Sequence, residues 1–104
     1  MSKLENETRE DILKELQQSF RSYMDTYQLD DIGLFEEQGP NGSYYIGYTI
    51  SRNGNTYMIH QTYDKNDKGL FSLASDEWTI ETDEPSFNDK KGIGSINDAF
   101  QRLH

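Results

Sequence analysis

Apolar side chains recur at steps of three and four residues over positions 8–28, as on one face of an α-helix. These apolar positions are Ile12, Leu13, Leu16, Phe20, Tyr23, Met24 and Tyr27. Thr8 and Asp11 have the spacing of a capping box, with Asp in place of the usual Glu or Gln. The pattern predicts one long helix over residues 8–28, and the polar residues 1–7 before it are expected to be disordered.

The clearest strand signal is an alternation of apolar and polar residues on both sides of Asn53-Gly54. Asn-Gly favours a type I′ turn, because both central residues of that turn need positive φ. A turn here sets the register of two strands at 43–51 and 56–63, whereas a shift by one residue would scatter the aromatic rings over both faces. One face of the predicted hairpin then pairs Ile50 with Tyr57, Tyr48 with Ile59, Ile46 with Gln61, and Tyr44 with Tyr63.

The opposite face of this hairpin is less apolar and supplies the candidate binding residues. A surface that mixes Tyr, Met and His is typical of a modest binding site. Two alternatives stay open: the face is exposed and binds a partner, or the last helix or the segment 83–94 packs over it. The predicted register places on this face the pairs Thr49 with Met58, Gly47 with His60, and Tyr45 with Thr62.

Shorter elements complete the chain. A last helix is expected to begin at Ser95, which with Asp98 forms a second cap, and its apolar positions include Ile96 and Phe100. Residues 74–76 form either a turn or a bulge. Turn residues and short alternating runs predict further strands at 32–37, 70–73 and 77–83, a turn at 39–42, a polar loop at 64–69 and an irregular segment at 83–94.

The order helix, hairpins, helix predicts the α+β class in a single domain over residues 1–104. Its parts are a long N-terminal helix, an antiparallel meander sheet of four or five strands, and a short C-terminal helix. The mean hydropathy of -0.95 would suit a disordered chain. Seven Tyr, five Phe and one Trp argue otherwise, because disordered chains are poor in such residues. We therefore expect a thin core built largely from rings.

The net charge of -9 bears on partners. Like-charge repulsion disfavours nucleic acid and anionic membranes, which attract basic patches. An acidic surface either keeps the protein in solution or meets a basic partner. The chain has no cysteine, no apolar run typical of a signal peptide, and no stretch near the ~20 apolar residues of a membrane span. We expect a cytoplasmic protein that binds neither nucleic acid nor a membrane.

Candidate catalytic and metal-binding chemistry is sparse. His60 is the one internal histidine, and a lone His without a Cys partner is more often structural or exposed than a base or a ligand. The loop that begins at Asp64 has Asn66 and Gly69 at calcium-loop positions, but Lys68 and Ser75 occupy two positions that need oxygen ligands from acidic side chains. We therefore predict no enzyme, no catalytic residue, no metal and no cofactor.

Four runs of the sequence resemble a family of small acidic uncharacterised proteins from Bacillus-type bacteria. The similarity covers nearly the whole chain. The resemblance implies a bacterial cytoplasmic protein without an assigned activity, and it offers no catalytic residues to carry over. The runs are TYQLDDIGLFEEQG, YYIGYTISRNGNTYMIHQ, EWTIETDEP and GIGSINDAF.

The first functional hypothesis is a non-catalytic protein-interaction module that binds another protein through a sheet face or an edge strand, as a monomer or weak dimer. The alternative is a small-ligand-binding domain with a tyrosine-lined pocket between the first helix and the sheet, which requires a real cavity. An enzyme centred on His60 beside an acidic residue comes third. Mimicry of nucleic acid comes fourth and requires carboxylates spaced like phosphates on one face.

Overall fold

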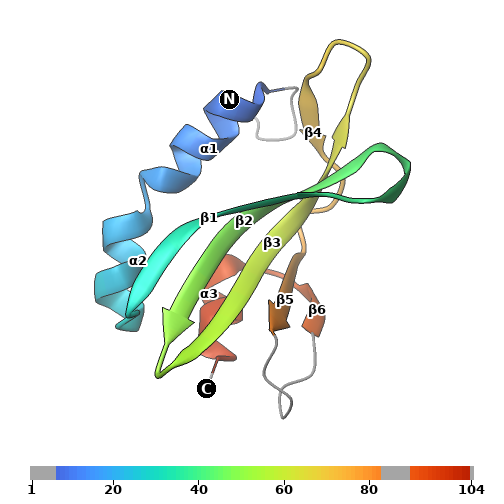
Figure 1. The fold of residues 1–104 in the computed structure, drawn as a ribbon. Helices are drawn as coiled ribbons and strands as arrows, with labels where there is room; N and C mark the ends of the chain where they lie inside the picture. The colour runs from blue at the N-terminus through green and yellow to red at the C-terminus, as the bar shows by residue number, and fades with distance from the viewer. Residues whose placement is uncertain (1–6, 83–89, 104) are drawn as a thin grey trace.

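The computed structural model describes residues 7–82 and 90–103. The fold is α+β, as predicted: helices near the N-terminus, an antiparallel sheet and a short C-terminal helix (Figure 1). The elements in chain order are α1 (Arg9–Gln17), α2 (Phe20–Tyr27), β1 (Asp31–Gln38), the 3-10 turn η1 (Pro40–Gly42), β2 (Ser43–Arg52), β3 (Asn55–Lys65), β4 (Phe71–Leu73), β5 (Trp78–Thr82), β6 (Lys90–Ile93) and α3 (Ile96–Gln101).

The predicted single helix over residues 8–28 is wrong, because the chain forms two helices that separate at Gln18 and Ser19. The N–H of Ser19 donates to the carbonyl of Leu16 at 3.2 Å, which is the tighter 3-10 pattern. The hydroxyl of Tyr48, on β2, donates to the same carbonyl at 3.0 Å. Figure 1 shows α1 and α2 with different axes, so the break lets the apolar stripe follow the twisted sheet.

Both predicted helix caps are confirmed. The side chain of Thr8 accepts a hydrogen bond from the N–H of Asp11 at 3.1 Å, and Ser95 accepts one from Asp98 at 3.1 Å. Each cap satisfies a backbone donor that has no partner within its helix. Local side-chain chemistry therefore determines where these helices begin.

The central hairpin has the predicted register, with all seven predicted cross-strand pairs present. Asn53 has a φ of 53° and Gly54 a φ of 82°, as a type I′ turn requires. Turn chemistry and the alternation of apolar residues agree here, and both faces of the hairpin are correctly predicted.

The sheet is a meander in the order β1-β2-β3-β5-β6, with β4 also paired to β3. β3 pairs with β4 at Tyr63 and with β5 at His60. Between these two pairings, residues 61–62 of β3 lie opposite residues 74–78, which join β4 to β5. The N–H of Ala74 still donates to the carbonyl of Thr62, and the side chain of Gln61 donates to the carbonyl of Asp76. Residues 74–76 therefore form a bulge-like interruption between β4 and β5, which both pair with β3, and not a turn between two strands of a hairpin.

The expectation of four or five strands is too low, because the described residues form a sheet of six. The additional strand, β6, lies in the segment predicted to be irregular and pairs Ile93 with Trp78 and Lys90 with Ile80. Its sequence, KKGI, has no clear alternation, so pairing with β5 makes it a strand. Residues 83–89 of that segment lie outside the described residues.

Of the N-terminal residues 1–7 that were expected to be disordered, residues 1–6 also lie outside the described residues. Glu7, the last of them, exchanges two backbone hydrogen bonds with Phe71.

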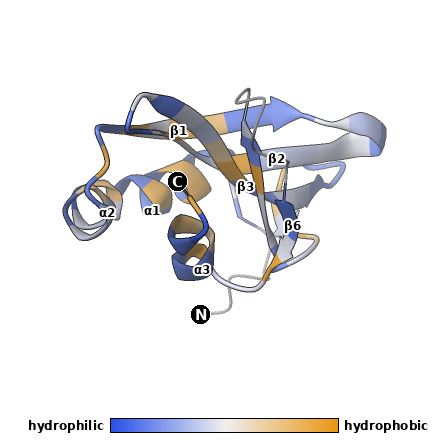
Figure 2. Cartoon of the chain, turned by 90° about the horizontal axis from the view of Figure 1, so that it is seen from below, coloured by the Kyte–Doolittle hydropathy of each residue, from blue (hydrophilic) through white to orange (hydrophobic). Residues whose placement is uncertain are grey.

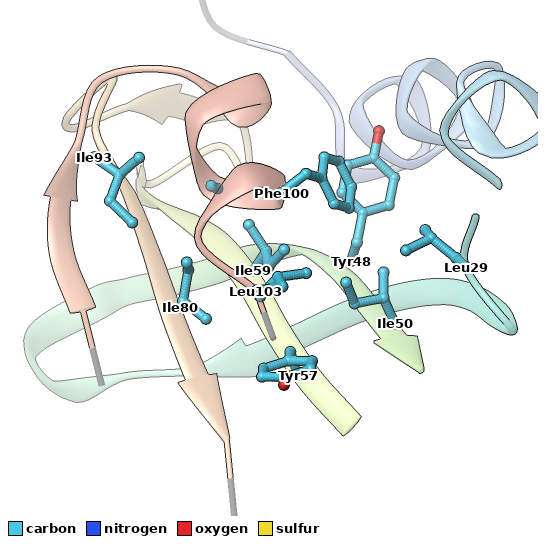
Figure 3. Packing of buried hydrophobic residues seen from close by; sticks show 10 residues of the cluster. Leu29, Tyr48, Ile50, Tyr57, Ile59, Ile80, Ile93, Phe100 and Leu103 are labelled. Atoms are coloured by element: carbon cyan, nitrogen blue, oxygen red, sulfur yellow. The ribbon is translucent and has the colours of Figure 1, made fainter. Parts of the chain in front are cut away.

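All three α-helices lie on one side of the sheet (Figure 2). The hydrophobic core lies between these helices and the sheet. Figure 3 shows Ile59 and Ile80 of the sheet together with Phe100 and Leu103 from the C-terminal end of the chain. Rings join the helices: Tyr27 stacks on Phe100 with centroids 4.3 Å apart, and its hydroxyl donates to Asn97. Because α3 packs here, it does not cover the mixed face of the hairpin; of the other predicted cover, Lys90–Ile93 pairs with β5, and residues 83–89 lie outside the described residues. We call that opposite side the open face.

Candidate functional site

The five predicted binding residues lie together on the open face, in rows that cross the sheet. Strand pairing aligns residues of neighbouring strands on the same face. No described helix covers these rows (Figure 2). The rows are Gly33, Thr49, Met58 and Glu81; Phe35, Gly47, His60 and Thr79; and Glu37, Tyr45 and Thr62.

His60 lies at the centre of the open face but is only 4% exposed. The ring of Phe35 stacks on it with centroids 5.3 Å apart, and the ring of Tyr45 lies 5.0 Å away. Both neighbouring rings are only partly buried. Phe35 and Tyr45 are therefore more accessible to solvent than His60, which packs beneath their rings.

Gly47 makes room for this arrangement. A Cβ on Gly47 would lie 2.0 Å from the carbonyl oxygen of Ile59 and 2.6 Å from the Cα of His60. These distances are far below van der Waals contact, so the backbone of β3 approaches this position too closely for any side chain. The missing side chain lets the backbones of β2 and β3 approach this closely beside His60.

The Nε2 atom of His60 lies 2.8 Å from Oε2 of Glu81. An ionised carboxylate only accepts hydrogen bonds, so Nε2 carries the hydrogen and donates it. Nδ1 is buried and has no hydrogen-bond partner among the described residues. The structure thus brings an acidic residue to His60: the imidazole is buried beneath the rings of Phe35 and Tyr45, whereas the Glu81 side chain, 38% exposed, reaches it from the surface.

The charged residues that pairing of β1 to β5 places on the open face are all acidic. They surround a centre of rings, Met58 and threonine hydroxyls. Such a surface attracts basic groups and repels phosphates. These carboxylates are Asp31, Glu37, Asp64 and Glu81.

The helix side of the sheet holds a second candidate site, which we call the helix–sheet cavity. Its volume is about 590 Å³, and the rings of Tyr23, Tyr48 and Tyr63 form part of its wall. Burial raises the pKa of Tyr48 far above its ordinary value. Burial, and then the charges of Glu7 and Glu15, raise the pKa of Tyr63 to about 12. Both hydroxyls therefore stay neutral at physiological pH. The alternative hypothesis requires a cavity of this kind.

A smaller cleft of about 490 Å³ lies where α1 begins, beside the loop between β3 and β4. Arg9 on α1 donates to Glu36 on β1 across it, with Nε 2.8 Å from Oε2. The Nζ of Lys65 lies 5.3 Å from the centroid of Tyr44. This cleft carries basic groups, whereas the described lining of the helix–sheet cavity contains no Lys, Arg or His.

The loop predicted over residues 64–69 is a hairpin loop, but it covers residues 66–70, because Asp64 and Lys65 belong to β3 and pair with Ser72 and Phe71 of β4. The side chain of Asn66 accepts from the N–H groups of Lys68 and Leu70, which is an Asx-type turn. Within residues 7–82 and 90–103, no group of three or more His, Asp or Glu side chains is placed to hold a metal ion. No helix in those ranges is long and apolar enough to cross a membrane.

Two residues whose side chains contact His60 on the open face were not among the predicted candidates. Phe35 follows the apolar pair Ile32 and Leu34, and alternation alone puts it on the opposite face. Glu81 alternates with Ile80 in the same way. Alternation could have found both, but their contact with His60 depends on which strands are neighbours.

The architecture defines a class: a small α+β protein in which the described helices cover one face of an antiparallel meander and no described helix covers the other (Figure 2). The family model described as "Family of unknown function (DUF5634)" matches residues 6–103. The chain belongs to this family, which agrees with the predicted membership of an uncharacterised family. No curated protein matches the chain.

Proposed function

We propose that this protein is a non-catalytic interaction module of the bacterial cytoplasm, monomeric or weakly dimeric, that binds a basic surface of another protein through its open face. One observation carries the proposal. The open face combines a partly exposed centre, formed by Phe35, Tyr45 and Met58, with charged groups on β1 to β5 that are all carboxylates.

The centre of this face is suited to binding because its rings are already held in place. Tyr45 lies against His60 and so close to Gly39 that a Cβ there would be 2.9 Å from its ring. A side chain that is ordered before binding loses little conformational entropy when a partner arrives. Met58 beside it is flexible and adapts to the partner's shape. Tyr and Met are both enriched in protein interfaces.

The carboxylates around the centre determine the kind of partner. Complementary charge speeds association and orients the encounter, and salt screens it. Binding is therefore expected to weaken as ionic strength rises.

The test begins with affinity capture from the native cells to obtain the partner, followed by titration of the purified pair. Thr49→Arg places a long cation at the centre of the open face, whereas Gln17→Arg makes a similar change in net charge on the exposed side of α1. Thr49→Arg is expected to weaken binding at least tenfold, and Gln17→Arg less than twofold. His60 is not a useful position for this test, because replacing a buried residue perturbs the fold.

Equal affinities of the two variants would remove the open face as the binding site. Capture of no specific protein by the wild-type chain would contradict the interaction module itself.

A second candidate function is binding of a small ligand. The helix–sheet cavity supports it by its volume, since ligand sites commonly have volumes of roughly 300–1,000 Å³. Its lining mixes apolar and aromatic side chains with polar and acidic ones.

A further inference from the structure

We propose that the outer edge of β1 binds an extended, basic segment of another protein, which joins the sheet as an added antiparallel strand. The inference deepens the proposed function and rests on it, because side chains of the added strand would extend the open face. β1 is the first strand in the sheet order, and among the described strands it pairs with β2 alone. Figure 1 shows β1 at the margin of the sheet. We call its outer side the β1 edge.

The hydrogen bonds to β2 show which backbone groups of β1 point outward. In an antiparallel pair, residues bonded to the partner strand alternate with residues whose N–H and C=O groups point away from it. The N–H of Gly39 donates to the carbonyl of Ser43 at 2.8 Å, so every second residue before Gly39 bonds to β2. The outward groups along the edge therefore belong to Leu34, Glu36 and Gln38, and no described residue hydrogen-bonds to them.

The N-terminal end of the β1 edge is closed by a side chain of the strand itself. Ile32 follows the same alternation, but its N–H donates to the carboxylate of Asp31 at 2.9 Å. This donor is already satisfied and offers nothing to an added strand. Residues 33–38 are therefore the part of the edge where pairing is expected.

The two edges of the sheet differ in the features that prevent strand addition. Proteins protect sheet edges with short strands, bulges, prolines and lysines. At the other edge, β6 has four residues, two of them lysines, and its register with β5 is interrupted. β1 has eight residues in unbroken register with β2 and contains neither Pro nor Lys. An edge of this length without such features is suited to strand addition.

The charges of β1 determine the chemistry of the added strand. Its charged residues are Asp31, Glu36 and Glu37. Arg9 already donates to Glu36, which alternation places on the helix side, so cations of the partner are expected on the open face beside Glu37. A second copy of this chain would bring its own carboxylates and a net charge of -9, and like charges on neighbouring strands are destabilising. The observations therefore favour a basic partner over self-pairing.

The open-face residues of β1 predict a pattern in the partner segment. Successive open-face side chains of an antiparallel strand would lie beside Glu37, Phe35 and Gly33. A Cβ at Gly33 would meet nothing within 4 Å, so a large ring has room to cover this glycine and pack on Thr49 in the same row. We expect a basic, an aliphatic and an aromatic residue at alternate positions of the segment.

A synthetic peptide with this pattern tests the inference: acetyl-Thr-Lys-Thr-Val-Ile-Phe-Thr-amide. In the expected register its third residue lies opposite Glu36 and its fourth opposite Phe35. N-methylation of the third residue removes an N–H that would donate to β1, whereas N-methylation of the fourth changes an N–H that points away from β1. We expect saturable binding of the parent peptide, binding about tenfold weaker for the first analogue, and a change below about twofold for the second.

Amide hydrogen exchange of the protein locates the peptide. Binding is expected to slow exchange at the N–H groups of Leu34 and Glu36, because they acquire hydrogen-bond partners. The N–H of Phe35 is the internal control, since the alternation assigns it to β2. Unchanged exchange at Leu34 and Glu36 in the saturated complex overturns strand addition.

Two matched pairs of variants test the edge and its charge. Glu36→Pro removes an outward N–H and Glu36→Ala keeps it, while both lose the ion pair with Arg9. Glu36→Pro is expected to bind the parent peptide about tenfold more weakly than Glu36→Ala. Glu37→Gln is expected to weaken binding about two- to fivefold, and Glu10→Gln, on exposed α1, to leave it unchanged. If circular dichroism shows that Glu36→Pro does not fold, the two N-methylated peptides decide the question.

The outcomes separate the inference from the function on which it rests. Saturation by no peptide at millimolar concentration, or equal binding of the two N-methylated analogues, overturns strand addition. Equal affinity of the Glu36 variants for the captured partner, with a loss in Thr49→Arg, also overturns it and keeps the open face as the binding surface. Unchanged partner affinity in Thr49→Arg contradicts the proposed function, whatever the peptides show.

Discussion

The two faces of one sheet achieve burial by different means. On the helix side, Ile59 is fully buried because α3 and the neighbouring strands cover it. On the open face, His60, the next residue, is also buried, but the rings of Phe35 and Tyr45 from its own sheet cover it. A helix layer buries a whole stripe of residues, whereas rings within a face bury only the residue between them. The second arrangement leaves the rings themselves available to a partner.

This difference also separates stability from function. The helix side has most of the buried apolar side chains, and burial of apolar area is the main favourable term in folding. The open face contributes less apolar burial and presents partly exposed groups. Large stability effects are therefore expected from changes on the helix side, and small ones from the open face, except where its backbone packs closely.

The comparison is sharpest for adjacent residues on β3. Ile59→Ala is expected to lower the free energy of unfolding by about 3–5 kcal/mol, because it removes a fully buried side chain and leaves a cavity. Met58→Ala, on the open face, is expected to cost about 1 kcal/mol or less, since Met58 is already partly solvated. Urea denaturation of both variants measures the difference. Similar losses for the two would show that the open face is covered in solution.

Gly47 is the exception expected on the open face. Gly47→Ala is expected to cost about 2–3 kcal/mol, because its Cβ would collide with the backbone of β3. Gly33→Ala is the matched control, since a Cβ at Gly33 meets nothing within 4 Å. That control is expected to be neutral or stabilising by about 0.5 kcal/mol. A small loss of unfolding free energy for Gly47→Ala in the same urea titration would mean that β2 and β3 separate easily to make room for the Cβ.

Alkaline titration probes burial on the helix side. Tyr63 has a pKa of about 12 in the folded chain against an ordinary value of 10.0. The unfolded chain therefore loses this proton first, and stability that is complete below pH 10 falls as the pH rises towards 12. The slope is expected to be about 1 kcal/mol per pH unit for this group. Tyr63→Phe removes the group and is expected to flatten the decline, which thermal unfolding at stepped pH measures. An unchanged slope would mean that Tyr63 is solvated.

The smallest expected effect concerns the junction of α1 and α2. Tyr48→Phe removes the hydroxyl that donates to the carbonyl of Leu16, and is expected to cost about 1 kcal/mol. Amide hydrogen exchange is expected to accelerate around Ser19, with α3 as the internal control. Exchange that accelerates equally in α3 would show that Tyr48 supports the whole helix layer and not this junction.

Local chemistry made several features predictable. The Asn53-Gly54 turn determines the register of its hairpin, and Thr8 and Ser95 determine where α1 and α3 begin. Each of these depends on residues close together in the chain. The break between α1 and α2 was not predictable, because part of its stabilisation comes from Tyr48 on a distant strand.

The same division holds for the candidate sites. Alternation assigned Tyr45, Thr49, Met58, His60 and Thr62 to one face, and the structure keeps them there. It could not show that Phe35 and Glu81 enclose His60, nor that helices and bulge leave a cavity on the other side. Those features arise between segments that are far apart in sequence.

By itself, the sequence determined the class of fold, the central hairpin and the residues that share each of its faces, because turn geometry and a two-residue period are local properties. Only the tertiary structure decided which face the helices cover, which residues bury His60, and that Lys90–Ile93 forms a strand. The physical reason is that burial and strand pairing depend on neighbours in space. A pattern along the chain shows which side chains point the same way, but not what they meet.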